Sequence, residues 1–155
     1  MRSNRTFSFL MAAVVVSSLL CAELSFAQTP QTFKADLRVV PISGANGRAN
    51  IDESVSVPAK ANATATLNGT KLTVTGSFEG FKSPASIAQL HSGPATGARG
   101  PVLFDLTIAK ETKGTMSGSF DLNADQVNLL KNGRLYIQIH NTNTPEGALW
   151  GWLLK

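Results

Sequence analysis

Short runs of alternating apolar and polar residues, separated by turn residues, restrict this chain to β-structure. Residues 33–40 place Lys34, Asp36 and Arg38 on one face of an extended segment and apolar side chains on the other. A period of two is the pattern of a half-buried strand. Asn68-Gly69 lies between two such runs. This pair predicts a hairpin, because a tight type I′ turn needs positive φ at both central positions.

Further strand-like segments follow at the spacing of about 8–12 residues that antiparallel sandwiches show. We expect strands at residues 33–40, 63–67, 72–78, 87–91, 102–109, 115–122, 135–140 and 149–154, weaker strands at 49–51 and 54–57, and a turn at 43–47. One short helix is expected at residues 123–132, where Asn123 and Gln126 form a capping-box pattern and Gly133 suits the helix end. A parallel sheet would need alternating helices. We therefore predict an all-β, antiparallel β-sandwich with one short helix.

The first 27 residues have the features of an export signal. Arg2 and Arg5 precede an apolar run at residues 7–20, and Ser25-Phe26-Ala27 places small residues at the positions that cleavage requires. The run is about 14 residues long, short of the roughly 20 that span a bilayer. We expect cleavage after Ala27, a flexible tail at residues 28–32 and a single domain at 33–155, secreted or periplasmic and without stable membrane insertion.

Two alternatives to a cleaved signal are an uncleaved anchor and a lipid-modified Cys21. A lipid-modification motif wants a small residue before the cysteine, and Leu20 stands there. Cys21 is the only cysteine, so cleavage would leave neither disulfides nor thiolate metal sites. The net charge of +4 is scattered along the chain. Because a nucleic-acid groove concentrates basic residues on one face, we expect no nucleic-acid binding.

The two histidines are the main candidates for a site. His91 ends the strand predicted at 87–91 and shares a face with Gln89, and His140 ends the strand at 135–140 on the face away from its apolar residues. If the chain has a site, we expect it where these two strand ends meet, although the sequence does not establish that His91 and His140 are adjacent. Imidazole suits copper and zinc, but a tight site would need Asp105, Glu146 or Gln89 to complete it. Alternatively, each histidine is hydrogen-bonded and fixes the loop that follows its strand.

The loop after His91 is rich in glycine. Gly93, Gly97 and Gly100 look superficially like a phosphate-binding loop, but no helix follows to hold an anion, so we interpret them as turn residues. Replacing Gly97 or Gly100 by valine should destabilise the loop if that glycine has positive φ. Arg99 in this loop is either a carboxylate ligand or an ordinary surface residue.

The two tryptophans near the C-terminus are further candidates for a binding surface. Trp150 and Trp152 share a face of the strand predicted at 149–154. We expect them to be partly buried in the core, the alternative being an exposed aromatic face for a partner or a sugar.

Three stretches resemble the CHRD domain family. IAQLHSGPATGARGPVLFDL is similar to the family's central motif, in which a histidine-containing strand runs into HxGpxGxxGPVv. LKNGRLYIQIHNTNTPEGALWGWL is similar to its closing motif, L…G.lYvnvHt..nP.GeirGq, and FKADLRVVPISG through Gly47 resembles its opening. The resemblance covers nearly all of residues 33–154. The family occurs in the growth-factor antagonist chordin and in secreted microbial proteins. Membership implies an extracytoplasmic β-rich domain with no established enzymatic activity.

The chain departs from the family pattern at two positions. Many microbial members carry HxH at the central motif, where this chain has Gln89 and His91. His140 matches the second-motif histidine, and Trp150 replaces the family's arginine. A cluster of three histidines is thus reduced to two histidines and an amide, which is a weak ligand for copper or zinc. The HxH-plus-strand pattern also resembles copper–zinc superoxide dismutase, although too few ligands remain here for dismutase chemistry.

Three hypotheses follow for function. The first is an exported, non-catalytic module, of Greek-key, immunoglobulin-like or superoxide-dismutase-like fold and monomeric, that binds an unknown protein or small ligand. Its binding residues would be Gln89, His91, Arg99, His140 and Asn141. The second is a periplasmic protein that binds copper or zinc through His91 and His140. The third is a hydrolase or dismutase-like enzyme, for which the sequence offers neither a nucleophile elbow nor a clear carboxylate pair.

Overall fold

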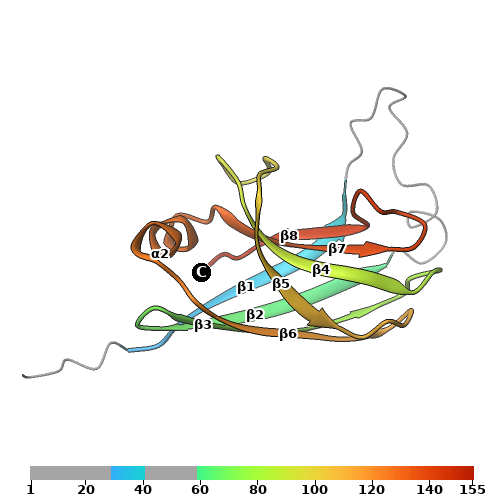
Figure 1. Ribbon diagram of the computed structural model, residues 1–155, viewed down its shortest axis with the longest axis horizontal. Coiled ribbons are helices and arrows are strands. Elements are labelled where there is room, and N and C mark those ends of the chain that lie inside the picture. Colours follow the sequence, from blue (N-terminus) through green and yellow to red (C-terminus); the bar gives the residue numbers. More distant parts are fainter. Residues whose placement is uncertain (1–28, 41–58) are drawn as a thin grey trace, which may run out of the picture.

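Eight strands close into an antiparallel barrel in the computed structural model, which describes residues 29–40 and 59–155 (Figure 1). In chain order they are β1 (Gln31–Val39), β2 (Lys60–Asn68), β3 (Lys71–Glu79), β4 (Ala85–Ser92), β5 (Val102–Ile108), β6 (Gly114–Asp121), β7 (Leu135–Asn141) and β8 (Leu149–Trp152). Helix α2 (Ala124–Lys131) connects β6 to β7. Around the barrel the order is β1-β2-β3-β6-β5-β4-β7-β8.

This order makes a Greek key. β4, β5 and β6 lie side by side in sequence order, and β7 returns to pair with the free side of β4. The all-β class, the antiparallel pairing and the Greek-key arrangement are therefore confirmed. The predicted open sandwich is wrong, because the described strands form a closed barrel.

Two corners close the barrel. β1 pairs with β2 along residues 31–37 and with β8 at Arg38 and Val39, so one strand belongs to both sides. At the opposite corner β5 and β6 are joined by the pairs Thr107↔Ser117 and Ile108↔Met116. A sandwich and a barrel both bury one face of every strand. The period-two pattern therefore could not distinguish between them.

The corners divide the barrel into two walls. The open wall consists of β1, β2, β3 and β6, and the covered wall consists of β4, β5, β7 and β8. On the open wall, β2 and β3 form the predicted hairpin, with Asn68 opposite Lys71 and Gly69 at φ 62°. β2 begins at Lys60, three residues before the predicted start, because Ala59, Ala61 and Ala63 continue the buried face.

The barrel interior is filled by apolar side chains from all eight strands. Its fully buried members of largest volume include Phe33, Leu37, Leu72, Leu90, Met116, Leu130, Leu135, Ile137, Ile139, Leu149 and Leu153. β1, β2 and β3 contribute through alternation, and nearly all of their outward residues are exposed. A single contiguous core of this kind is what holds a domain of this size together.

The predicted helix forms as the capping pattern indicates. The Asn123 side chain accepts a hydrogen bond from the Gln126 backbone at 2.9 Å, and the Asn123 backbone donates to the Gln126 side chain at 3.0 Å. Gly133 follows the helix with φ 65°. Only Leu130 of α2 is buried. No helix in the described part of the chain has the length and apolarity needed to cross a membrane.

Some predicted boundaries shift and some lie outside the described residues. β1 begins at Gln31, so the strand includes two residues of the predicted tail. β8 ends at Trp152, and Leu154 makes an isolated bridge to Lys34. The export signal with its cleavage site, the turn at 43–47 and the weaker strands at 49–51 and 54–57 fall outside residues 29–40 and 59–155.

Candidate functional site

The outer face of the covered wall carries a row of stacked rings. His91 of β4 lies opposite Tyr136 of β7, which lies opposite Trp152 of β8. The ring centroids of His91 and Tyr136 are 4.8 Å apart and those of Tyr136 and Trp152 are 4.9 Å apart, both pairs stacked. Trp150 meets Trp152 edge-on at 4.6 Å. Aromatic contacts across neighbouring strands stabilise a sheet beyond the area they bury.

A second, polar row runs beside the rings. Gln89 of β4 pairs with Gln138 of β7, and Gln138 pairs with Trp150 of β8. Gln89 donates a 2.8 Å hydrogen bond to the carboxylate of Asp105 on β5. As predicted, Gln89 and His91 share a face, and the apolar residues of β7 point to the other side, into the core.

Two loops cover this face. The Gly/Pro loop (residues 93–101) follows β4, and the C-terminal loop (residues 142–148) follows β7. Arg99 joins them: its guanidinium donates to the backbone carbonyl of Glu146 at 3.2 Å and lies 5.6 Å from the ring centroid of Trp150. Gln138 donates to the same carbonyl at 2.8 Å. Tyr136 contributes a hydroxyl, which accepts from the Gly100 backbone at 3.2 Å.

The glycines of the Gly/Pro loop were interpreted from the sequence as turn residues, and the structure gives them two different roles. Gly97 has φ 88°. Gly93 and Gly100 are required for a different reason, because a Cβ on either would lie 2.3 Å and 1.8 Å, respectively, from a backbone oxygen. The backbone approaches itself so closely there that only hydrogen fits.

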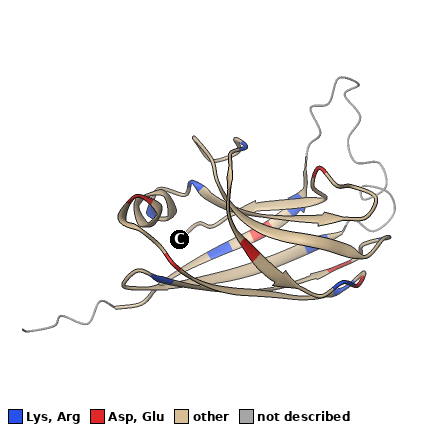
Figure 2. Ribbon diagram, viewed as in Figure 1, with Lys and Arg blue, Asp and Glu red and all other residues tan. Residues whose placement is uncertain are grey.

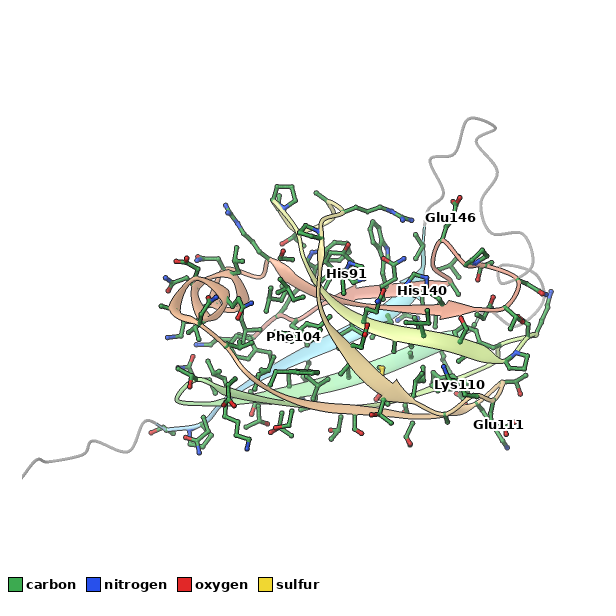
Figure 3. All side chains as sticks on the ribbon, viewed as in Figure 1. His91, Phe104, Lys110, Glu111, His140 and Glu146 are labelled. Atoms are coloured by element: carbon green, nitrogen blue, oxygen red, sulfur yellow. The ribbon has the colours of Figure 1, made fainter. Side chains whose placement is uncertain are left out.

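Each histidine is fixed by one loop. Nδ1 of His91 lies 3.2 Å from the Gly100 carbonyl, and Nδ1 of His140 lies 2.8 Å from the Pro145 carbonyl. Because a carbonyl only accepts, both Nδ1 atoms carry a proton, and in a neutral ring Nε2 then carries the lone pair. Both Nε2 atoms are buried and have no hydrogen-bond partner among the described residues. Figure 3 shows both rings on the side of the barrel where the loop bearing Glu146 folds over.

The predicted meeting of the two strand ends is wrong. β4 and β7 are antiparallel neighbours, so His91 near the end of β4 pairs with Tyr136, and His140 pairs with Ile87. These pairs are four residues apart, roughly 13 Å along the strands. The Gln89–Gln138 pair lies between them. The histidines therefore stand on either side of an amide pair, with their imidazoles on one face.

His91 stays neutral more readily than a histidine in water. Burial lowers its pKa below the ordinary value of 6.5, and the nearby His140 and Arg99 add to this lowering. The hydrogen bond to the Gly100 carbonyl acts in the opposite direction.

Other predicted binding residues lie in the same region. Asn141 is buried, and its side-chain oxygen accepts from the backbones of Asn143 and Thr144 and from the Thr144 hydroxyl at 2.6–3.0 Å. It thus holds the C-terminal loop in place. Its contact with a ligand, like that of Gln89, His91, Arg99 and His140, stays a prediction. The expectation that Trp150 and Trp152 are partly in the core is wrong, because they are half-buried on the outer face.

Sequence reasoning placed Tyr136 and Gln138 on the same face as His140 but missed that both are buried there. Both are almost completely buried although they alternate with the core residues of β7. A fully buried strand reads as a continuous apolar run. Tyr136 and Gln138 interrupt such a run in β7, so the sequence pattern did not indicate that loops bury them. The available signal was a tyrosine and a glutamine at alternate positions among Leu135, Ile137 and Ile139.

A groove opens beside the aromatic row. It has a volume of about 520 Å³ and lies between β1 and β8, where Trp150 and Trp152 form part of its wall. Lys34, Asp36 and Arg38 of β1 border it, together with Lys155. Within residues 29–40 and 59–155, no group of three or more His, Cys, Asp or Glu side chains has the arrangement of a metal site.

Comparison with known proteins identifies the chain by its family. Neither the curated proteins nor the solved structures gave a match to this chain. The family model of the CHRD domain matches residues 39–153, which include β2 to β8, both loops and both histidines. The match covers most of the sequence and agrees with the motifs around His91 and His140. The chain therefore belongs to the CHRD domain family.

Proposed function

We propose that this protein is an exported, non-catalytic module that binds an anionic ligand in the groove beside Trp150 and Trp152. The observation that supports the proposal is the composition of that groove, in which two half-exposed indoles lie next to several cationic side chains. Apolar surface with a few convergent polar groups is typical of ligand sites. CHRD membership agrees with a binding role, because the family is known as a non-catalytic module.

The charges around the groove favour an anion. Lys34, Arg38 and Lys155 border it, and Arg99 reaches over Trp150 from the Gly/Pro loop. Asp36 is the acidic residue among those that line the groove, and it already pairs with Arg38. Figure 2 shows that over the rest of the described chain the two signs are interspersed. A local excess of cations beside aromatic faces suits a ligand with carboxylate groups.

A larger groove of about 610 Å³ lies on the open wall. It is bordered by Lys60 and Glu79, whose side chains form an exposed ion pair at 3.0 Å, and by Lys113. Its charged lining sets Arg38, Lys60 and Lys113 against Asp36 and Glu79, which is a smaller excess of cations, and the described residues that line it include no tryptophan. The aromatic groove on the other side of β1 therefore supports a binding site better.

Tryptophan fluorescence tests the proposal directly. Trigalacturonate, which combines carboxylates with pyranose rings, should change the emission in a saturable way, and neutral maltotriose should not. Binding should weaken as salt is added, since exposed charges are screened. Trp150→Ala and Lys34→Gln should each weaken binding, whereas Lys71→Gln on the far side of the barrel should not. Equal responses to the two sugars, or no response to the acidic one, would contradict the proposal.

Export has its own test. Expression of the full chain with its natural start, followed by N-terminal sequencing of the protein found outside the cytoplasm, should give a chain that begins at Gln28. Retention of residues 1–27 on the recovered protein would contradict cleavage after Ala27.

A second candidate function is the binding of copper or zinc by His91 and His140. The observation that favours it is that each Nδ1 is held by a loop carbonyl, while each Nε2 is buried without a hydrogen-bond partner among residues 29–40 and 59–155. A backbone carbonyl that fixes one ring nitrogen and leaves the other for the metal is the usual arrangement of a ligating histidine. Titration of the purified protein with Cu(I), Cu(II) and Zn(II) tests this candidate. Unchanged affinity in both His91→Gln and His140→Gln would exclude these residues as ligands.

A further inference from the structure

The aromatic groove beside Trp150 and Trp152 adjoins a second hollow at the C-terminal end of α2. This helix-end hollow has a volume of about 360 Å³, and its lining includes Phe33 of β1 and Lys131 of α2. Three residues line both the aromatic groove and the helix-end hollow: Thr96, Leu154 and Lys155. Because the two depressions share these residues, they form one continuous track from the tryptophans to the end of the helix.

The junction of the two hollows is built from three segments of the chain. Leu154 lies there with a side chain that is 47% exposed. The turn after α2 passes directly beside it, since a Cβ on Gly133 would lie 2.9 Å from the Leu154 side chain. Thr96 of the Gly/Pro loop donates its hydroxyl to the Gly133 carbonyl at 2.9 Å. The junction thus holds an exposed apolar side chain in a fixed place along the track.

Cationic side chains are distributed along the whole track. They are Lys34, Arg38 and Lys155 in the aromatic groove and Lys131 in the helix-end hollow. Asp36 is the acidic residue among those that line the track, and it pairs with Arg38. Cations that recur along a groove complement a ligand whose negative charges recur along a chain.

The backbone of the track favours a polysaccharide over an extended peptide. Extended peptides commonly pair their main chain with a free strand edge. Here β1 pairs with β2 on one side, and on the other Lys34 and Leu154 exchange backbone hydrogen bonds of 2.7 and 2.9 Å. A Cβ on Gly151 of β8 would lie 2.7 Å from the Asp36 carbonyl oxygen, so β8 also packs closely against this edge. Little of the edge is left for a peptide, whereas pyranose rings need only the apolar surface of the indoles and the polar side chains beside it.

We propose that the aromatic groove and the helix-end hollow together bind an extended chain of uronic-acid units that is longer than a trisaccharide. The inference rests on the proposed function, anion binding beside Trp150, and adds to it the class and the length of the ligand. Each depression alone has the volume of a small-molecule site. A short oligomer therefore fills one of them, and a longer one places carboxylates near both Lys34 and Lys131.

Calorimetric titration of the purified protein with oligogalacturonates of two lengths measures the extent of the site. A hexamer offers about four registers to a trimer-sized site, so length alone would raise its affinity about fourfold. We expect hexagalacturonate to exceed this gain, with one molecule bound per chain and an affinity about 10-fold or more above that of trigalacturonate. Neutral maltohexaose should not bind. This comparison uses the unaltered protein, so it does not depend on the folding of any variant.

Variants locate the far half of the ligand. Lys131→Gln should weaken the binding of hexagalacturonate about threefold or more and leave that of trigalacturonate unchanged, because only the longer chain reaches the helix-end hollow. Trp150→Ala should weaken the binding of both. Lys113→Gln is the matched control, since it removes a lysine that borders the groove of the open wall, and it should leave both affinities unchanged.

The outcomes separate the inference from the function on which it rests. A gain from trimer to hexamer of about fourfold or less, or an unchanged hexamer affinity in Lys131→Gln, would overturn the extended track and keep anion binding beside Trp150. Loss of hexamer affinity in Lys113→Gln would place the ligand on the open wall. Hexaglutamate, a peptide with as many carboxylates, should bind more weakly than hexagalacturonate, and equal or tighter binding would overturn the class of ligand. Failure of both oligogalacturonates to bind would overturn the proposed function itself.

Discussion

The open and covered walls of the barrel bury their residues in different ways. On the open wall, β2 alternates strictly: Ala61, Ala63 and Ala65 face the core, and the residues between them lie at the surface or near it. On the covered wall, six of the seven residues of β7 are buried, including Tyr136 and Gln138, whose side chains face away from the core. β2 thus has one buried face and β7 has two, although both are antiparallel strands of the same barrel.

The difference teaches where to look for function in a barrel of this kind. An antiparallel sheet normally leaves one face to water, as the open wall does. The second cover of β7 consists of two loops, and loops held on a rigid scaffold commonly carry binding residues. The ring stack and the two unpartnered Nε2 atoms lie under these loops. Burial outside the core, rather than the core itself, marks the candidate site.

Truncation of an outward residue on each wall would break or confirm this comparison. Tyr136→Ala removes a ring that is 1% exposed and in contact with His91 and Trp152, so we expect a loss of about 3–5 kcal/mol in the free energy of unfolding. Thr64→Ala, at an exposed outward position of β2, should change it by less than about 0.5 kcal/mol. Urea denaturation measures both. Similar losses for the two variants would show that the loops do not bury the outer face in solution.

Two glycines of the Gly/Pro loop sharpen the same comparison. Gly100→Ala places a Cβ 1.8 Å from the Ser92 carbonyl oxygen, so the loop must move away from β4. We expect this variant to lose about 3 kcal/mol in the free energy of unfolding. Gly97→Ala is the matched control in the same loop. A Cβ there would have no neighbour within 4 Å, so only the left-handed backbone at φ 88° should lower the free energy of unfolding, by about 1 kcal/mol. Thermal unfolding of both variants tests the order, and a larger loss for Gly97→Ala would contradict it.

The fold could be predicted from the sequence wherever one face of a strand meets water. Residues 33–40 and 72–78 gave their strands because polar residues alternate with core residues, and Asn68-Gly69 gave the hairpin through its turn chemistry. Closure of the barrel could not be predicted. It depends on two short joints, at Arg38–Trp150 and at Thr107–Ser117, which look like any other strand residues.

The candidate site was predictable in its members but not in its geometry. The motifs pointed to His91 and His140, and the structure places both on one outer face. Their separation by the Gln89–Gln138 pair follows from the antiparallel register of β4 and β7, which no local pattern encodes. The role of Asn141 was missed for a similar reason, since its three accepted hydrogen bonds depend on the turn that follows it.

Loss of the cap of helix α2, which links the two walls, should destabilise the protein less than Gly100→Ala does. Asn123→Ala removes the side-chain acceptor for the Gln126 backbone, and we expect a loss of about 1 kcal/mol in the free energy of unfolding. Asn128→Ala, at an exposed position inside the same helix, is the control and should be neutral or slightly stabilising. Circular dichroism during urea unfolding measures both, and equal effects would argue against the capping box as the stabilising feature.

The smallest expected effect concerns the protonation of His91. Burial lowers the pKa of His91 below 6.5 in the folded protein, with His140 and Arg99 adding to the lowering, while the unfolded chain keeps the ordinary value. Between the two values the unfolded state binds more protons, so stability must fall as the pH drops below 6.5 and return as it rises.

Metal-chelated samples of the natural chain and of His91→Gln, unfolded with urea between about pH 8 and pH 5, isolate this contribution. The carboxylates titrate alike in both proteins, so the difference between the two stability curves reports His91. That difference should shrink as the pH falls below 6.5 if the covered wall holds the imidazole neutral. A constant difference would mean that folding leaves the pKa of His91 unchanged, and that the two walls expose their outward residues to water more equally than the structure indicates.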